Sequence, residues 1–496
     1  MKNLIVLIAI VTLFCSSVFA QSDVDALRYS FISPTGNSAR GMALGGAVGA
    51  LGADPSTVHS NPAGLAQYKS GSFNITSGSI SLKNESQYLK GNTQTNNLFK
   101  PVLPGINLVT TNRNTVNGQP AKTGWINTNF SLGWNKVADF NRNMNYSGTN
   151  TQNSFTDYVA NYSSGVDASD LASNAEQEQQ GYYYFENMFW QAFLIDSISN
   201  GNYYAYYDND FTQMAQTGQI ITKGGMNEFN LSFAANYEHK LYIGFGLNVN
   251  RIRYSEQNIF AERDYPITKN NWNSYEFTRN LETKGTGFGG RLGVVFRPNN
   301  SLRFGATIHT PNLMSLKDNY YDELYVQNDD NSTQDLRTID KEFSYTITTP
   351  MKFGFQAAYI FEKQGFLSAE IESIDYSTMS LTADNNLFST TNQVIANKYS
   401  NAINLKLGGE YAYESFRFRG GYARMGNPIK NSAGFSNNQI SLGMGVQERD
   451  WAFDFGVVKS LSKDTYIPYK VAGSVANAVN SNVNGTMLVL TLTSKF

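Results

Sequence analysis

The chain has 496 residues and a formal net charge of −2, and charged residues make up only 16% of it. This balance excludes a basic nucleic-acid-binding surface and a strongly charged partner of either sign. Gly, Tyr and Phe are abundant (42, 30 and 32 residues), a composition typical of a barrel whose strands face lipid and water, and also of a soluble β-sandwich or propeller.

The first twenty residues have the pattern of a secretory signal peptide. Lys2 is positively charged, Leu4–Phe14 is apolar but too short to cross a bilayer, and Ala20 ends a cleavage-site pattern. We therefore expect residues 1–20 to be removed. Cleavage there takes away Cys15, the only cysteine, so the mature chain is expected to have no disulfide.

Residues 21–68 show no strand-like alternation. Ser38–Gly52 is a run of small residues, too short to span a membrane and too rich in glycine for a stable isolated helix. Asp54–Thr57 indicates a turn or helix start, and Pro62 restricts Asn61 to extended geometry. We expect this segment to be buried against another part of the protein; a flexible leader is the alternative.

Residues 69–496 alternate between apolar and polar positions. In Leu241–Val249 five apolar residues share one face, and in Leu488–Phe496 leucines and the closing phenylalanine do the same. The opposite faces carry glycines and full charges, and no helices remain to cover a sheet. We therefore predict an all-β fold, an antiparallel transmembrane β-barrel with an apolar outer wall and a polar lumen that accommodates residues 21–68 as a plug.

Short turns alternate with long polar connections, which predicts fourteen strands with both ends on the periplasmic side. The turns are expected at Glu238–Lys240, Arg297–Asn300, Glu362–Gln364, Tyr413–Ser415 and Glu448–Asp450, with a sixth near Lys136–Asp139. The long connections are expected at 84–123, 151–223, 264–274, 319–340, 383–399, 428–436 and 463–484. The aromatic residues expected to form an interface girdle beside the turns are Tyr237, Phe296, Tyr359, Tyr411, Trp451 and Phe496.

Charged residues that oppose apolar rows are expected to face the lumen, because a charge at the lipid midplane costs about 2–4 kcal/mol. They are Arg303, Lys352, Glu370, Lys406, Arg417, Arg419 and Asp454. Glu370, Glu372, Arg417 and Arg419 are predicted to form a charge network that fixes the plug, and acid–base catalysis by the same groups is the alternative.

The third predicted strand, Phe140–Tyr146, is a poor membrane wall. One face holds Asn141, Asn143 and Asn145, and the other carries Arg142 beside Phe140, Met144 and Tyr146. We expect this strand to lose regular pairing along part of its length, with unsatisfied backbone groups turned to a hydrated lumen. A short strand near the periplasmic interface is the alternative interpretation.

The loop at 151–223 contains an aromatic and aliphatic cluster that includes Phe189, Trp190, Phe193 and Leu194. It is either a capture surface for apolar ligands or a small core that folds the loop. The three histidines, His59, His239 and His309, fall in different elements without metal-ligand spacing. We expect no enzyme activity, no metal and no cofactor.

The N-terminal segment resembles a family. Asn37–Gly41, the small-residue run, Ala53–Val58 and Asn61–Leu65 are similar to the hatch of FadL/TodX-type transporters of hydrophobic compounds. Further matches are Phe288–Pro298, Leu302–Pro311, Ile374–Ser377, Arg419–Pro428 and the closing Phe496. The resemblance implies a fourteen-stranded barrel in the bacterial outer membrane, plugged by a hatch that contains Asn61, Pro62, Ala63 and Gly64. It also implies a lateral opening in the third strand, here placed at Phe140, Asn141, Arg142, Asn143 and Met144. The long loop at 151–223 departs from the family pattern.

The predicted organisation is a signal peptide (1–20), a hatch (21–68) and a barrel (69–496). The function that the resemblance implies is passive transport of fatty acids or aromatic hydrocarbons, captured at extracellular loops and released sideways through the wall. The alternative is a surface binding protein, such as an adhesin or a haem-binding receptor, on a plugged barrel. The expected partners are hydrophobic small molecules, outer-membrane lipids and, through Phe496, the barrel-assembly machinery; we expect a monomer.

Overall fold

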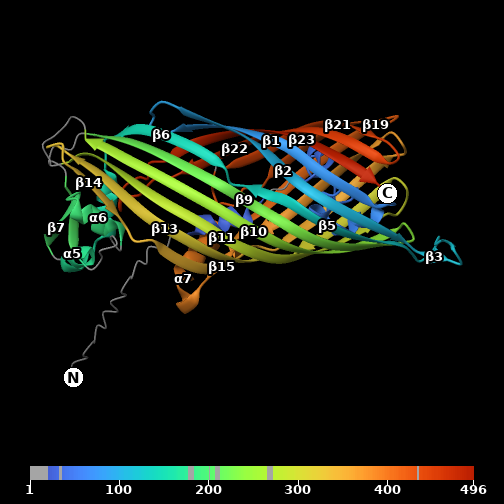
Figure 1. The fold of residues 1–496 in the computed structure, drawn as a ribbon, viewed down its shortest axis with the longest axis horizontal. Coiled ribbons are helices and arrows are strands. Elements are labelled where there is room, and N and C mark those ends of the chain that lie inside the picture. Colours follow the sequence, from blue (N-terminus) through green and yellow to red (C-terminus); the bar gives the residue numbers. More distant parts are fainter. Residues whose placement is uncertain are drawn as a thin grey trace, which may run out of the picture.

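The computed structural model describes residues 21–32, 36–176, 184–199, 201–206, 213–264, 272–432 and 435–496. The predicted signal peptide lies outside the described residues. Fourteen antiparallel strands form a closed barrel, because the first strand pairs with the last one along its whole length (Figure 1). The predicted fold class is confirmed. Among the described residues no helix is long and apolar enough to cross a membrane.

The wall consists, in chain order, of fourteen strands, some of them in two segments. They are β1 (Ser72–Gln87), β2 (Gln94–Arg113), β5 (Trp125–Asp139) continued by β6 (Arg142–Asn150), β9 (Met214–Tyr237), β10 (Leu241–Asp264), β11 (Trp272–Phe296), β12 (Leu302–His309) continued by β13 (Leu313–Asn328), β15 (Lys341–Thr348) continued by β16 (Lys352–Phe361), β17 (Gly365–Asp375) with β18 (Ser380–Thr382), β19 (Asn401–Tyr413), β20 (Phe416–Met425), β21 (Ser436–Gln447), β22 (Trp451–Tyr466) and β23 (Val479–Lys495). A short strand, β14 (Thr333–Arg337), extends β13 into a hairpin beyond the barrel.

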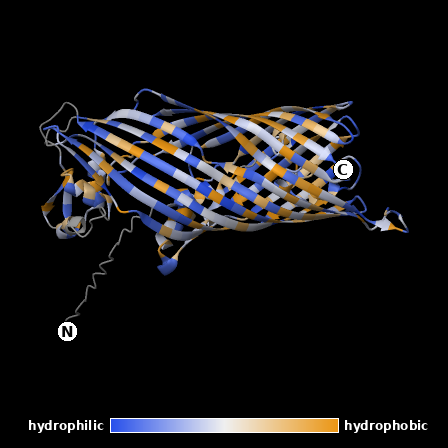
Figure 2. Cartoon of the chain, in the orientation of Figure 1, coloured by the Kyte–Doolittle hydropathy of each residue, from blue (hydrophilic) through white to orange (hydrophobic). Residues whose placement is uncertain are grey.

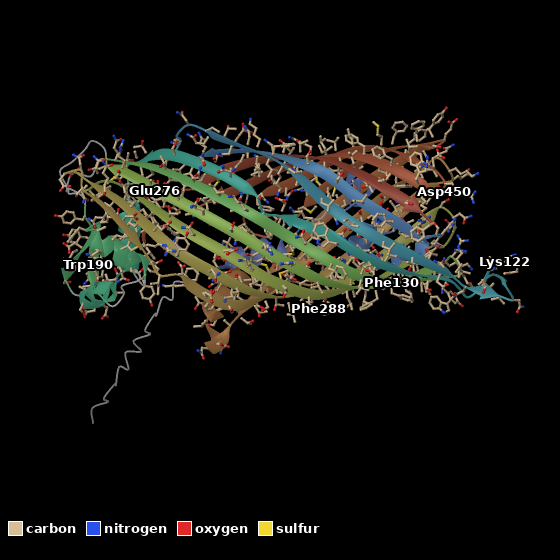
Figure 3. The ribbon with its side chains drawn as sticks, in the orientation of Figure 1. Lys122, Phe130, Trp190, Glu276, Phe288 and Asp450 are labelled. Atoms are coloured by element: carbon tan, nitrogen blue, oxygen red, sulfur yellow. The ribbon has the colours of Figure 1, made fainter. Side chains whose placement is uncertain are left out.

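Apolar residues gather on the strands in the half of the barrel that carries the short turns (Figure 2). On β10 every second residue of Leu241–Val249 is apolar and exposed, and the next outward residues are Arg251 and Arg253. This length matches the roughly 9–11 residues that a tilted strand needs to cross the hydrocarbon core. Phe130 and Phe288 lie in this apolar band, whereas Glu276 lies on the polar extension beyond it (Figure 3). The strands therefore project well past the membrane on the extracellular side.

All six residues of the predicted aromatic girdle are exposed on the outer surface. Five of the predicted turns lie where the alternation placed them, between β9 and β10, β11 and β12, β16 and β17, β19 and β20, and β21 and β22.

The sixth predicted turn, near Lys136–Asp139, is wrong. β5 runs through these residues, with a register shift against β9 between Lys136 and Ala138. The turn lies instead between Arg113 and Trp125, where β3 (Thr115–Val116) and β4 (Gln119–Pro120) form a small hairpin. The predicted connection at 84–123 accordingly contains strand β2. The predicted number of fourteen strands is nevertheless correct, because β2 was missed while β5 and its continuation β6 were counted as two strands.

The described part of residues 21–68 lies inside the barrel (Figure 1). It forms α1 (Asp23–Ser30), α2 (Ala39–Ala43), α3 (Thr57–Ser60) and the 3-10 helix η1 (Pro62–Gln67). The side chains of Ser38 and Asn61 cap α2 and η1, because each accepts a hydrogen bond from an unpaired backbone N–H of the first turn. Pro62 begins η1, at a position where its missing N–H costs nothing.

The described parts of 151–213, namely 151–176, 184–199, 201–206 and 213, form a small extracellular subdomain at the barrel mouth (Figure 1). Its described elements are α4 (Phe155–Tyr162), α5 (Ala168–Glu176), α6 (Phe185–Gln191), β7 (Ile195–Ser199) and β8 (Asn202–Ala205). A further helix, α7 (Ser389–Lys398), follows β18, contacts α1 and projects from the side of the barrel, with only Ile395 buried (Figure 1).

Candidate functional site

The hatch motif Asn61–Gly64 is fitted into the barrel wall. Asn61 is fully buried, and its amide nitrogen donates to the Val294 carbonyl and to Gln356 Oε1, both at 3.1 Å. Its own oxygen accepts from the backbone N–H of Ala63 at 3.1 Å. Asn61 thus joins the hatch to β11 and β16 while capping η1.

Glycines of the wall make this fit possible. A Cβ at Gly293 would lie 2.1 Å from Asn61 Oδ1, and a Cβ at Gly244 would lie 2.3 Å from the backbone nitrogen of Ala63. Real side chains do not approach so closely. The glycines on the inner face of these strands therefore leave the space that the hatch backbone occupies.

The small-residue run is held in the same way. The Ala39 N–H donates to Thr491 Oγ1 at 2.7 Å, and Ser441 Oγ donates to the Ala43 carbonyl at 3.0 Å. Arg40 lies 3.5 Å from Glu410 and 3.7 Å from Asp54. The hatch is therefore tied to several strands around the barrel.

Buried ion pairs line the lumen beside the hatch. Lys406 contacts Glu370 at 2.9 Å and Glu372 at 3.0 Å, and its side chain is only 4% exposed. Arg419 contacts Glu410 at 2.6 Å and Asp454 at 2.5 Å, with Arg417 3.9 Å from Glu410. The structure places all seven predicted lumen charges inward: Arg303 donates to the Leu51 carbonyl of the hatch, and Lys352 lines an internal cavity. The four residues of the predicted network belong to two clusters, one around Lys406 and one around Glu410.

That internal cavity, of about 60 Å³, separates the hatch from the upper lumen. Glu228 crosses it to form a two-pronged ion pair with Arg291 at 2.7 and 2.5 Å, and His59 Nδ1 lies 3.2 Å from the same carboxylate. The cavity is polar and has room for a few water molecules. No group of three or more potential metal ligands occurs in the part of the chain that the structure describes.

The third strand is interrupted at Phe140 and Asn141, between β5 and β6. Asp139 accepts from Lys100 of β2 at 2.6 Å and from Lys136 at 2.5 Å, so a charged clip marks the bend. Before the bend, β5 pairs with both β2 and β9; after it, β6 pairs with β9 alone among the described strands. The bend falls just beyond the apolar outer residues Phe130 to Trp134 of β5, at the extracellular edge of the membrane band.

Strand β2 consequently has a free edge. Its ladder with β5 ends at Gly105, and for Gln94–Pro104 no backbone partner exists on that side among the described residues. Pro101 and Pro104 lie in this stretch, as expected for an edge strand, because proline cannot donate to a ladder. Phe99 and Leu103 point outward from it. We define the seam as the boundary between Gln94–Pro104 and the bent third strand, where side-chain contacts such as Asn145 N–H to Asn96 Oδ1 at 2.9 Å stand in place of a backbone ladder.

Beyond the bend, β6 lies against the inner face of β1. Asn84 and Ser86 of β1 donate to the carbonyls of Asn143 and Asn145, at 2.9 and 2.5 Å. Arg142 reaches across to Asp464 of β22 and Ser481 of β23, both at 2.8 Å. Side chains thus satisfy the backbone of β6 where the strand ladder is missing.

Above the hatch, α1 fills an apolar chamber. Ala26 and Tyr29 are fully buried in a cluster with residues of seven wall strands and α7. Tyr29, Phe140 and Tyr254 form an edge-to-face aromatic group with centroid separations of 5.7–6.4 Å. The chamber therefore borders the bend of the third strand.

The four predicted capture residues differ in how much of each side chain is exposed. Phe189 and Leu194 are fully buried in the core of the subdomain, so a capture surface cannot include them in this conformation. Trp190 is partly buried against Tyr203, with ring centroids 5.7 Å apart. Phe193 is 63% exposed and has a positive φ of 56°, a strained conformation for a bulky residue.

A small aromatic cleft of about 90 Å³ lies under the subdomain, at the barrel mouth. It is lined by Tyr146, Phe155, Phe260 and Phe277 and by Arg279. Arg279 lies over the rings of Phe185 and Phe277, at 4.9 and 5.4 Å. Sequence reasoning did not find this cleft or the α1 chamber, because the residues come from strands far apart in the chain. The paired prolines of β2 were the one available signal of the seam.

The closed barrel, its apolar outer band, its polar lumen and the hatch inside it together place this protein in the class of plugged transmembrane β-barrels. Residues 197–464 match the family model described as outer membrane protein transport protein (OMPP1/FadL/TodX), and the chain belongs to this family. It is an outer-membrane transport protein for hydrophobic compounds and not an enzyme.

Solved structures share the fold. A Pseudomonas aeruginosa FadL homologue aligns with 14% identity over 94% of this chain and 100% of its own, with a TM-score of 0.56. The P. putida toluene transporter TodX aligns with 12% identity over 94% and 99% of the two chains, with a TM-score of 0.53. The Ralstonia pickettii toluene transporter TbuX aligns with 13% identity over 93% and 99%, with a TM-score of 0.50. A search of curated proteins finds no match.

Proposed function

We propose that this protein passes hydrophobic compounds from the outside into the outer leaflet of the membrane, with exit sideways through the seam beside β2. The observation that carries the proposal is the ladder that ends at Gly105 while β6 folds inward at Phe140. A closed ladder would give an apolar solute no path between lumen and lipid, because every strand edge would be paired.

The physical need for such a path is simple. An apolar compound gains free energy when it leaves water for hydrocarbon, but the polar outer surface of the membrane slows its passage. A protein that offers an apolar surface, a dry chamber and an opening at membrane level lowers this barrier without an energy source. The charged hatch below blocks the axial route to the periplasm.

Capture is proposed to begin at exposed apolar residues of the subdomain. Phe193 is held outward by its strained backbone, Ile198 is 74% exposed, and Tyr204 is 37% exposed on the neighbouring strand. From there the proposed route passes the aromatic cleft at the barrel mouth and then the separate apolar cluster around α1, which includes Phe140. Fatty acids and aromatic hydrocarbons are the substrate classes that fit such a route.

The test is to close the seam. Lys100→Cys and Asp139→Cys place one thiol on each side of it, at side chains that meet in a 2.6 Å ion pair, and a short bifunctional thiol reagent joins them in a mature chain that is otherwise expected to lack cysteine. We expect uptake of a labelled hydrophobic probe to fall by at least about tenfold after cross-linking, since the exit itself is removed.

The matched control joins Leu108→Cys to Leu132→Cys, a pair within the intact ladder of β2 and β5. Its cross-linking should leave uptake unchanged. Normal uptake through a fully cross-linked seam would show that solute leaves elsewhere.

Two further proposals concern partners. Phe496 is 68% exposed, and its backbone N–H donates to the Gly71 carbonyl at 3.1 Å, so its ring is free to contact the barrel-assembly machinery at the periplasmic end. Substitution of Phe496 by serine should then lower the amount of folded barrel in cells. The continuous apolar band is proposed to be in contact with outer-membrane lipids all around a monomer.

A further inference from the structure

The α1 chamber contains two carboxylates in an otherwise apolar wall. Asp318 of β13 is 1% exposed, among neighbours that include Met314, Leu316 and Tyr345. Glu256 of β10 accepts from the hydroxyl of Tyr254 on the same strand. In the described part of the barrel wall, no Lys, Arg or His lies within ion-pair distance of either carboxylate. Each carboxylate accepts from a wall tyrosine, Asp318 from Tyr345 at 3.4 Å and Glu256 from Tyr254, but no cation of the described wall compensates its charge.

Helix α1 supplies further partners. The amide nitrogen of Gln21, just before the helix, donates to Asp318 at 2.6 Å. The guanidinium of Arg28 lies 3.5 Å from Glu256 and stacks over the ring of Tyr254, 4.1 Å from its centroid. Between these two contacts, Ala26 and Tyr29 fill the apolar volume. The segment thus presents an apolar body with a hydrogen-bond donor at one end and a cation at the other.

This segment fits the chamber incompletely. Gln21 Oε1 and Ser30 Oγ are buried, and neither finds a hydrogen-bond partner among the described residues. A buried polar atom without a partner is unfavourable, which opposes the seating of α1. Outside the chamber, α1 is held mainly at its start, where Asp23 contacts Lys398 at 2.6 Å and the Tyr399 hydroxyl at 2.7 Å. Lys398 is 40% exposed and lies at the chamber rim.

We propose that the α1 chamber is the substrate chamber and that Asp318 and Glu256 select apolar compounds that bear a hydrogen-bond donor or a positive charge. Phenols, anilines and alkyl or aryl amines are the matching classes. In this assignment α1 occupies the site in the manner of a ligand, and the substrate takes over its contacts. The inference rests on the proposed function and names its substrate class.

The chemistry of the wall determines the preference. A donor-bearing or cationic substrate adds a partner to a carboxylate whose charge no cation of the described wall compensates, and Tyr254 offers its face to a cation. A fatty-acid or benzoate anion of the same size would bring a further negative charge into a low-dielectric space, which is unfavourable. Uncharged hydrocarbons would enter but leave both carboxylates without a compensating charge.

The experiment uses the full-length barrel in lipid vesicles and three probes with the same apolar body: 4-butylbenzylamine, 4-butylphenol and 4-butylbenzoate. Binding is measured by calorimetry and uptake by flux. We expect the amine and the phenol to bind at least about tenfold more tightly than the benzoate. In the double variant Asp318→Asn, Glu256→Gln this ratio should fall towards one. Glu342→Gln, at an exposed side chain on the next strand, is the control and should keep the native ratio.

A second variant covers a failure of the double variant to fold. Arg28→Gln removes the internal cation, so the amine should bind more tightly than to the native chain, while the benzoate stays weak. Equal binding of all three probes, or tighter binding of the benzoate, would overturn the inference but leave transport intact. Absence of flux for every probe would overturn the proposed function together with it. An unchanged ratio in a folded double variant would show that these carboxylates do not select the substrate.

Discussion

The two halves of the lumen are built on different principles. Near the periplasmic end the hatch contacts the wall through buried amides, ion pairs and glycines that admit its backbone, as at Asn61 and Gly293. At the extracellular end α1 rests in an apolar chamber, and two of its buried polar atoms lack partners among the described residues. The hatch also contains buried polar atoms without a partner among the described residues, such as Asn37 Oδ1 and Ser60 Oγ, so the halves differ in the kind of contact: mainly polar and ionic around the hatch, mainly apolar around α1.

This difference explains how one barrel can block polar solutes and still pass hydrophobic compounds. Polar groups that are fully paired in a low-dielectric space fix a single arrangement, because each broken pair leaves an uncompensated charge. Apolar packing is less directional, so another apolar body of similar size can replace it. We therefore interpret the hatch as the permanent seal and the chamber as the part that exchanges its contents.

The largest expected effect comes from breaking the hatch side at Lys406. Lys406→Met leaves Glu370 and Glu372 buried without their cation, which should lower the free energy of unfolding by about 3–5 kcal/mol. Urea unfolding in lipid vesicles, followed by the shift in gel mobility between folded and heated barrels, measures it. Lys317→Met removes an exposed pair and should have little effect. A stable Lys406→Met barrel would mean that the two carboxylates are not charged.

The next largest effect is expected when a wall glycine that contacts the hatch is replaced. Gly293→Ala introduces a Cβ about where Asn61 Oδ1 lies and should destabilise the barrel by roughly 1–3 kcal/mol while raising leakage of polar solutes. Gly420→Ala is the matched control, because the nearest atom to its Cβ belongs to Leu442 at 3.8 Å. If both variants leak equally little, the hatch does not depend on this close approach.

A smaller effect is expected where the subdomain joins the barrel. Ser154 caps α4 by accepting from Thr156 N at 3.1 Å, and it donates to the buried Glu262 at 2.5 Å. Ser154→Ala should destabilise the subdomain by about 1 kcal/mol and make it easier to cleave by protease, with the barrel intact. Ser169→Ala, an exposed residue on α5, is the comparison. Equal cleavage of the two variants would assign the anchoring to other contacts of Glu262.

The smallest effect concerns the clip at the bend. Asp139→Asn weakens partly exposed ion pairs to Lys100 and Lys136, so the stability should change by about 1 kcal/mol or less. Uptake should rise modestly, by less than about threefold, since the seam is held less firmly. A large fall in uptake would instead show that the clip keeps the exit open.

Sequence patterns predicted the wall far better than its contents. Alternation located Leu241–Val249 and its neighbours, because lipid on one side and water on the other impose a strict period of two. The same rule failed at β2, where Pro101, Pro104 and several polar residues hid a strand whose upper part has no neighbour on one side. It failed also at Lys136–Asp139, where charges mark a bend rather than a turn.

By itself the sequence determined the fold class and the presence of an apolar band, because these depend on local periodicity. The predicted number of strands agreed only because the missed strand β2 was offset by counting β5 and β6 as two. The Asn61–Gly64 motif added the hatch through its resemblance to a family. Only the tertiary structure decided which residues share a site. Asp318, Glu256, Tyr254 and Gln21 are up to 297 residues apart, and closure of the barrel around α1 is what brings them into one chamber. Likewise Phe189 and Phe193 look equivalent in sequence, but packing buries one and exposes the other.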